Sequence, residues 1–395
     1  MRPIQIYLDS SDFSDVVNVN KKSKDYSNTI RYLIEKRDLG LIQIRFSEAH
    51  VVEASPKSQD AINFALDRLK TINLICGNNS LIHPIDLIEF EVSSSNTLDL
   101  KKDYMRIFRN DGSWLPALFD LSEIVPDVED SVRKDVEKMG REAKRKYLKD
   151  GKPTALWYGE MRAANSASGN IVANNLPLTL EAVRIVKKYF MGESSRNDAV
   201  RALHNSVNNL EVFGKWYEKD WESAFAISSN LRFLGKEFEA ALSSARQEFD
   251  LFKKQQNEIG INNKTLLEMS HRAFQEVLAE SSNKLANSMA LQIGSTPKPM
   301  NDPWKATPGL TCSVTLAMHI ARRSVATKMP RRPMASDFPD CYHAIYLPYV
   351  DVFRADSFIA GMLEECKLPF STLIADNFLQ LPEKIEKLLK ERYGQ

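Results

Sequence analysis

The chain has 395 residues, 43% hydrophobic and 27% charged, an ordinary globular composition that allows a large core and two or three domains. Lys and Arg number 53 against 52 Asp and Glu, so the formal net charge is +1. This balance excludes a generally basic protein, and any surface that binds nucleic acid has to be a local patch.

The start of the chain and its cysteines indicate where the protein works. Residues 1–9 lack the long apolar core of a signal peptide, and no stretch is apolar enough to span a bilayer. The four cysteines, at positions 76, 312, 341 and 366, are far apart and form no CxxC pair. This spacing favours free buried thiols over disulfides or a zinc site. We therefore expect a cytoplasmic protein with no membrane association.

Strand and helix patterns alternate in the first ninety residues. Apolar residues recur at every second position in 4–8 and again in 42–46, which predicts two strands. A helix is predicted over 27–38 between them. Further helices are expected from Ser47 and over 62–72, so the order strand, helix, strand, helix favours a parallel α/β sheet.

The middle of the chain is different. Between about 98 and 290 almost no strand pattern occurs, and apolar residues at three- and four-residue spacing predict amphipathic helices, most clearly over 231–252 and 179–190. Turn-forming residues at 93–97 and 294–299 mark the two junctions with the rest of the chain.

The α/β rhythm returns near the end. Helices are predicted over 341–347, 357–366 and 381–392, with strands over 350–354 and 370–374.

These patterns together predict the organisation of the whole chain. We expect one α/β domain with a Rossmann-like parallel sheet, formed by residues 1–92 and 302–395. A helical insertion of residues 93–301 is expected to interrupt it.

Four acidic residues are placed where an α/β sheet binds ligands. Asp9 and Asp356 each follow a predicted strand, and ligands of parallel sheets bind beyond the carboxyl ends of the strands. Glu53 lies on the helix after the second strand, and Asp340 opens the helix before the strand that leads to Asp356. Such a cluster suits hard Mg²⁺ or Mn²⁺ ions, two of which can activate water and stabilise a leaving oxygen.

The order of these residues resembles the PIN-like nuclease superfamily. The matching pieces are Leu8-Asp9-Ser10-Ser11, Ser47 to Glu53, Asp340-Cys341-Tyr342-His343-Ala344 and Val350 to Asp356. The resemblance implies a PIN-like sheet and metal-dependent phosphodiester hydrolysis, usually of RNA. It assigns metal-binding and catalytic roles to Asp9, Glu53, Asp340 and Asp356. The chain has Arg354-Ala355 where the family commonly has a Thr.

Simpler roles exist for the same acids. Asp9 and Asp340 could each cap a helix, since Asp is a favoured N-cap residue, but independent caps falling in this order are a weaker explanation than a shared metal site.

Supporting roles at the site are expected for Asp12, Glu48, Asp337 and His50. His50 could orient a carboxylate or contact substrate, and a satisfied core histidine is an equal alternative. His343, three residues after Asp340, is equally ambiguous, and we place neither histidine among the metal ligands.

Two basic runs are candidates for binding phosphates. Residues 141–152 alternate with acids, which is typical of a solvated helical face. The second run immediately precedes Asp337, and its arginines are the expected substrate-binding residues: Arg322, Arg323, Arg331 and Arg332.

The sequence therefore predicts a metal-dependent endonuclease that cleaves RNA, with single-stranded DNA less favoured. One alternative is a catalytically inactive PIN-like binding or scaffold protein, and another is an acidic-site phosphatase of small phosphate esters. The large insertion suggests a regulatory protein partner or a homo-oligomer, as in a toxin or defence effector.

Overall fold

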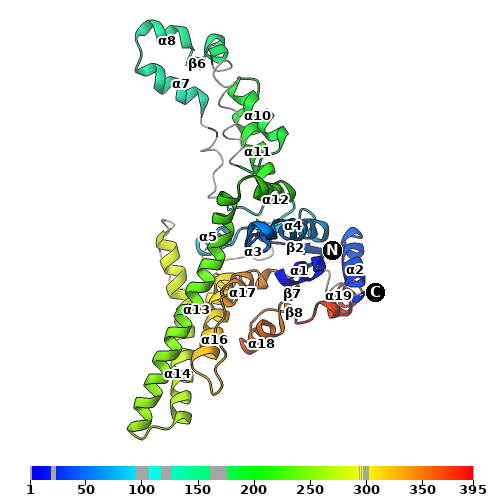
Figure 1. Cartoon of the computed structure of the whole chain (residues 1–395), viewed down its shortest axis with the longest axis vertical. Helices are drawn as coiled ribbons and strands as arrows, with labels where there is room; N and C mark the ends of the chain where they lie inside the picture. Colours follow the sequence, from blue (N-terminus) through cyan, green and yellow to red (C-terminus); the bar gives the residue numbers. More distant parts are fainter. Residues whose placement is uncertain are drawn as a thin grey trace. The chain divides into compact units, whose positions relative to one another are not determined.

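The chain divides into two compact units in the computed structural model (Figure 1), which describes residues 2–18, 24–94, 106–116, 125, 127–160, 176–292, 294, 296 and 302–394. Unit 1 consists of residues 1–55, 71–116 and 227–395, and unit 2 of residues 56–70 and 117–226. No helix among the described residues has the length and apolarity needed to cross a membrane.

A four-stranded parallel sheet forms the centre of unit 1 and confirms the α/β prediction. Its order is β2 (Ile42–Arg45), β1 (Ile4–Tyr7), β7 (Val352–Arg354) and β8 (Leu373–Ala375). β1 pairs with β2 and with β7 in parallel, so the two ends of the chain form one sheet, as predicted. Every residue of β1 is buried, which is typical of a parallel sheet covered on both faces.

Helices from both ends of the chain belong to this α/β region. Those from the first part are α1 (Ser10–Val17), α2 (Lys24–Asp38), α3 (Glu48–Ala54) and α5 (Pro84–Ser94). Of α4 (Ile62–Cys76), residues 71–76 belong to unit 1 and residues 62–70 to unit 2. Those from the last part are α15 (Pro303–Ala306), α16 (Pro308–Val325), α17 (Asp337–Ala344), α18 (Ser357–Glu365) and α19 (Leu381–Tyr393). The two-residue strands β3 (Ser80–Leu81) and β4 (Phe108–Arg109) pair antiparallel beside them. All four cysteines are free thiols, as predicted.

Two long helices from the middle of the chain also enter unit 1. They are α13 (Trp221–Glu258) and α14 (Asn263–Gln292), and α14 packs against α5 and α16. Gly235 lets α13 approach the segment before α17, because a Cβ there would lie 2.2 Å from the backbone oxygen of Ala335. Arg232 on the same helix donates to the backbone oxygen of Ser55, just after α3, at 2.5 Å. α13 therefore contacts the end of α3 and the start of α17.

Unit 2 is mainly helical. Its helices include α7 (Val128–Glu137), α8 (Arg141–Tyr147), α10 (Leu180–Phe190), α11 (Arg196–Val207) and α12 (Leu210–Lys219). A two-residue hairpin of β5 (Leu148–Lys149) and β6 (Lys152–Pro153) follows α8. The middle of the chain thus contains a short hairpin that helical periodicity did not reveal.

The compact units are divided differently from the predicted domains. Residues 227–292, which we expected in an insertion of 93–301, belong to unit 1 with the sheet, and residues 56–70, expected in the sheet domain, belong to unit 2. Amphipathic periodicity shows that a helix has an apolar face but not which surface that face meets.

Candidate functional site

A small pocket opens at the carboxyl edge of the sheet. Its lining includes Asp9, directly after β1 and Leu8, and Asp340 on α17, together with Tyr7, His343, Phe353, Arg354, Ala355 and Ile359. Asp356, two residues after β7, is exposed and is not among the lining residues. Two of the four predicted metal ligands therefore line one pocket from opposite ends of the chain.

Helix capping accounts for part of the placement of these acids. Asp9 caps α1, accepting a hydrogen bond from the backbone N–H of Ser11 at 2.7 Å. Asp356 caps α18 in the same way, through the N–H of Ile359 at 2.8 Å. Asp340 is not a cap, because α17 begins at Asp337 and not at Asp340 as we expected. Capping thus explains two positions and leaves the third without a structural reason.

Asp340 is in an unfavourable electrostatic environment. Burial raises the pKa of its carboxyl well above the ordinary value of 3.8, and the carboxylates of Asp9, Glu53 and Asp356 raise it further. Asp337, one turn earlier, adds to the same effect. Asp340 therefore lies in a crowded negative field to which the other three predicted ligands contribute.

His343 links Glu53 to the pocket. Its Nε2 lies 2.8 Å from Oε2 of Glu53 and donates to it, because a carboxylate can only accept. Its Nδ1 lies 2.6 Å from the hydroxyl of Tyr7, which is also 2.6 Å from Oγ of Ser47. Ser10 lies 3.3 Å from Nε2. A buried polar chain therefore fixes the position of the Glu53 carboxylate.

This contact changes the ionisation of both partners. Burial alone raises the pKa of Glu53, but the hydrogen bond and the charge of His343 outweigh it and lower the pKa to about 2. Burial lowers the pKa of His343, whereas Glu53, Asp9 and Glu48 reverse that effect, so its pKa is raised. The pair is thus stabilised as carboxylate and imidazolium.

Asp12 is held by an arginine. It is buried, and its carboxylate lies 3.1 Å from a guanidinium nitrogen of Arg354, which also lines the pocket. Burial raises the pKa of Asp12 to about 8, although Arg354 lowers it in part. Asp12 also accepts the backbone N–H of Asp9 at 3.1 Å. It therefore supports the turn after β1.

The other supporting candidates on α3 differ from each other. His50 is a satisfied core histidine, donating from Nε2 to the backbone oxygen of Leu8 at 2.9 Å and accepting the N–H of Ser47 on Nδ1 at 3.0 Å. Glu48 is half-buried, and desolvation raises its pKa to about 7, although a hydrogen bond from Tyr342 acts in the opposite direction. Glu48 thus remains close to the site, whereas His50 fixes the backbone of Leu8 and Ser47.

Two of the four predicted substrate-binding arginines have contacts within the protein. Arg331 donates to both carboxylate oxygens of the fully buried Asp337, at 2.9 and 2.8 Å. Arg322 lies over the ring of Phe274, 5.4 Å from its centroid. Arg323 and Arg332 are exposed. Asp337 is therefore a structural partner of Arg331, and the basic run offers fewer free cations than its sequence suggests.

The donors at this edge fit a hard divalent cation in their chemistry. Asp9, Glu53, Asp340 and Asp356 supply carboxylate oxygens, which Mg²⁺ and Mn²⁺ prefer. Among the residues that the structure describes, no three His, Cys, Asp or Glu side chains are grouped so that they could hold a metal ion. The ligand types therefore suit such an ion, but their spacing does not form a complete set.

Three residues that contribute to the site were not chosen from the sequence. Tyr7 is a polar-tipped residue within an apolar strand, and His343 is spaced one helical turn from Asp340. Arg354 appeared only as a difference from the PIN-like pattern. The sequence did hold one signal: Tyr7 places a hydroxyl at the last position of a buried strand, and a buried polar group needs a hydrogen-bond partner.

Comparison with protein-family models, curated proteins and solved structures gives no match for this chain. The fold and the site define an α/β protein with a four-stranded parallel sheet and, at its carboxyl edge, a small pocket lined by two acids, an arginine and a histidine.

Proposed function

We propose that this protein is a metal-dependent endonuclease of the PIN-like type that hydrolyses phosphodiester bonds, RNA in preference to single-stranded DNA. The supporting observation is that Asp340 lines a pocket at the carboxyl edge of a parallel sheet together with Asp9, and that the charges of Asp9, Glu53 and Asp356 all raise the pKa of its carboxyl. Repulsion among uncompensated acids destabilises a fold, so their concentration favours a role in binding cations.

Each residue has a defined task in this proposal. Asp9 and Asp340 would hold a divalent cation from the two sides of the pocket, and Glu53 would do so in the orientation that His343 gives it. A bound Mg²⁺ or Mn²⁺ supplies an activated water and stabilises the leaving oxygen. Tyr7 keeps the His343 ring in place through Nδ1, which leaves Nε2 directed at Glu53.

The variant Asp340→Asn tests the proposal. It keeps the shape of the side chain but removes an anionic ligand, so cleavage of a mixed RNA and DNA panel should fall by at least about a hundredfold. The thermal stabilisation by Mn²⁺ should also shrink, because a ligand that binds only the folded state stabilises it by mass action. Asp67→Asn, an exposed acid 3.2 Å from Lys70, is the matched control. Undiminished cleavage and an undiminished Mn²⁺ shift in Asp340→Asn would refute the site.

A second candidate is a PIN-like binding protein without catalysis. This candidate is favoured by two ion pairs within the protein, in which Arg354 neutralises Asp12 and His343 neutralises Glu53 without a metal ion. Such a protein would bind nucleic acid whether or not Mn²⁺ is present, and it would leave every polynucleotide of the panel intact. The same assay therefore separates the two candidates.

A further inference from the structure

A second run of positive charge, with all its basic side chains exposed, lies on unit 2. Residues 138–152 contain seven basic residues, Lys138, Arg141, Lys144, Arg145, Lys146, Lys149 and Lys152, against two acids, Glu142 and Asp150. This segment carries a net charge of +5 in a chain whose total is +1. The local patch that the overall charge requires is therefore present here. We call residues 138–152 the basic face.

All seven basic side chains of this face are exposed. Within the described part of the chain, Lys146 has an acidic partner, Glu160, at 3.8 Å, whereas Lys144 and Arg145 beside it make no ion pair. Three of the basic residues occupy the last turn of α8. Their charge is favourable beside the negative end of a helix dipole, but the dipole does not neutralise it.

The hairpin after α8 places two further lysines together. Lys149 and Lys152 are direct cross-strand partners in the β5–β6 pair. The turn between them is tight, since Asp150 and Gly151 both have positive φ, 53° and 78°. Like charges directly opposite each other destabilise an antiparallel pair. The hairpin therefore places two like charges in cross-strand register beside its turn, and an anion bound there would reduce their repulsion.

We propose that the basic face binds the phosphodiester backbone of single-stranded nucleic acid. Lys144 and Arg145 on α8 and Lys149 and Lys152 on the hairpin form a series of exposed cations in one short segment. Such a series suits a polyanion with regularly spaced phosphates better than a single anion. The inference rests on the proposed function for its choice of polymer, but binding through this face does not require cleavage.

The residue composition of α8 argues against an anionic membrane as the partner. A helix that lies on a bilayer needs one apolar face to insert. The described side chains of α8 include charges at Arg141, Glu142, Lys144 and Arg145, and the helix contains no Leu, Ile, Val, Phe or Met. The basic face can therefore bind a partner by electrostatic attraction alone, and a polynucleotide binds in this way without an apolar contact.

The test measures binding of a labelled single-stranded RNA of mixed sequence in EDTA, so that no metal-dependent cleavage takes place. The variant replaces Lys144, Arg145, Lys149 and Lys152 with Gln. Loss of four phosphate contacts should reduce the slope of log K against log salt by about 2 to 3 and lower affinity at low salt on the order of tenfold or more. A double variant of Lys149→Gln and Lys152→Gln should lose about half of the slope change and, because repulsion is relieved, melt no lower than the parent protein.

A matched control removes the same amount of charge elsewhere. Lys70, Arg201, Lys284 and Lys305 each pair with a nearby acid on the surface, and all four become Gln in the control. Its salt slope should stay close to that of the parent. An unchanged slope in the basic-face variant, an equal change in the control, or tighter binding to anionic vesicles than to RNA would overturn the proposal. If the basic face binds RNA as expected but Mn²⁺ produces no cleavage, the proposed function fails and this inference stands.

Discussion

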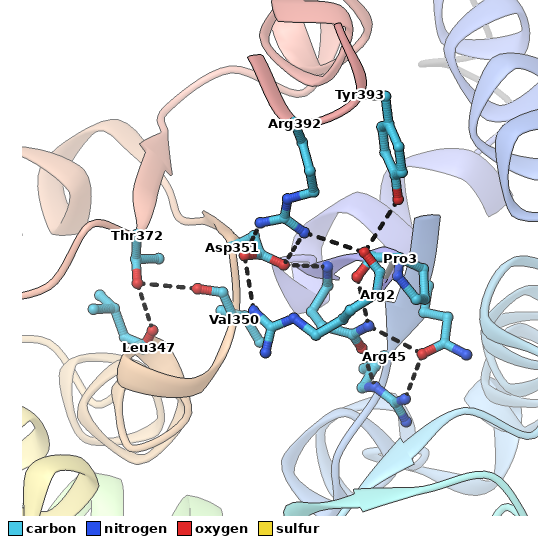
Figure 2. A network of polar contacts seen from close by, with 11 residues as sticks. Arg2, Pro3, Arg45, Leu347, Val350, Asp351, Thr372, Arg392 and Tyr393 are labelled. Atoms are coloured by element: carbon cyan, nitrogen blue, oxygen red, sulfur yellow. Dashed lines mark hydrogen bonds and ion pairs between the residues drawn. The ribbon is translucent and has the colours of Figure 1, made fainter. Parts of the chain in front are cut away.

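The acidic residues at the two edges of the central sheet have opposite electrostatic environments. At the amino edge, Asp351 precedes β7 and is neutralised by Arg392 and Arg2, at 2.6 and 3.1 Å (Figure 2). It also accepts the backbone N–H of Gln5 at 2.7 Å. At the carboxyl edge, Asp340 faces other acids instead. The amino edge joins the two ends of the chain, whereas at the carboxyl edge the nearby acids raise the pKa of Asp340.

The buried Arg45, the last residue of β2, illustrates a fully satisfied network. Arg45 on β2 donates to Gln5, at 2.6 Å, and Gln43, at 2.7 Å, and to the backbone oxygens of Ser80 and Arg109. Buried polar groups with complete partners stabilise one arrangement of the chain. The number of polar residues therefore does not distinguish the candidate site, whereas the like charges that act on Asp340 do.

Arg331→Gln should have the largest effect on stability. It tests whether the ion pair of Arg331 with Asp337 stabilises the fold. It leaves the fully buried Asp337 without its cation, which should cost about 3 kcal/mol of unfolding free energy. Urea unfolding measures this loss. The double variant with Asp337→Asn should recover part of it, because the unpaired charge is then gone. Equal stability of Arg331→Gln and the parent would show that the pair is not structural.

His343→Gln should weaken the site at the carboxyl edge with a smaller effect. Glu53 loses its fixed orientation, so the affinity for Mn²⁺ should fall by about tenfold to a hundredfold. Calorimetric titration of Mn²⁺ measures this directly. His319→Gln, which removes another buried histidine packed on Phe274, is the control and should leave Mn²⁺ affinity unchanged. The same decrease in both variants would assign His343 to packing alone.

Asp351→Asn should affect stability and leave metal binding intact. The substitution removes the charge that holds Arg2 and Arg392, and these partly exposed pairs are screened by solvent, so the expected cost is about 1–2 kcal/mol. The Mn²⁺-induced rise in melting temperature should match that of the parent. A reduced rise would show that the amino edge is coupled to the site and would remove the contrast between the edges.

In the absence of metal, the Asp340→Asn variant should be more stable than the parent protein, and this difference should increase as pH rises. The pKa of Asp340 is raised in the folded state, so folding binds a proton, and the parent loses stability as pH rises above about 4 toward the folded pKa. Asn cannot ionise, so the advantage of the variant should grow steadily over that window. Melting temperatures from pH 4 to 9 in EDTA test this. An advantage that is constant with pH would contradict the crowded field.

Local patterns predicted β1 and β2 closely, whereas β7 begins two residues and β8 three residues after its predicted start. The alternation at Ile4 and Ile6, and again at Ile42 and Ile44, corresponds to β1 and β2, and α18 ends within one residue of its predicted end. These features depend on neighbouring residues in the chain, whose periodicity reports directly which side is buried. The start of α17 was misplaced by three residues because Asp340 also suits a cap.

The contacts that give each acid its character were not visible in the sequence. His343 meets Glu53 across 290 positions, and Arg354 meets Asp12 across the β7–α1 region. The sequence by itself determined an α/β protein with acids after its strands, since strand periodicity and helix caps are local. Only the tertiary structure decided that Asp351 and Asp337 are neutralised while Asp340 is crowded by like charges. Ionisation depends on burial and on charges within a few ångströms, which residues distant in sequence supply.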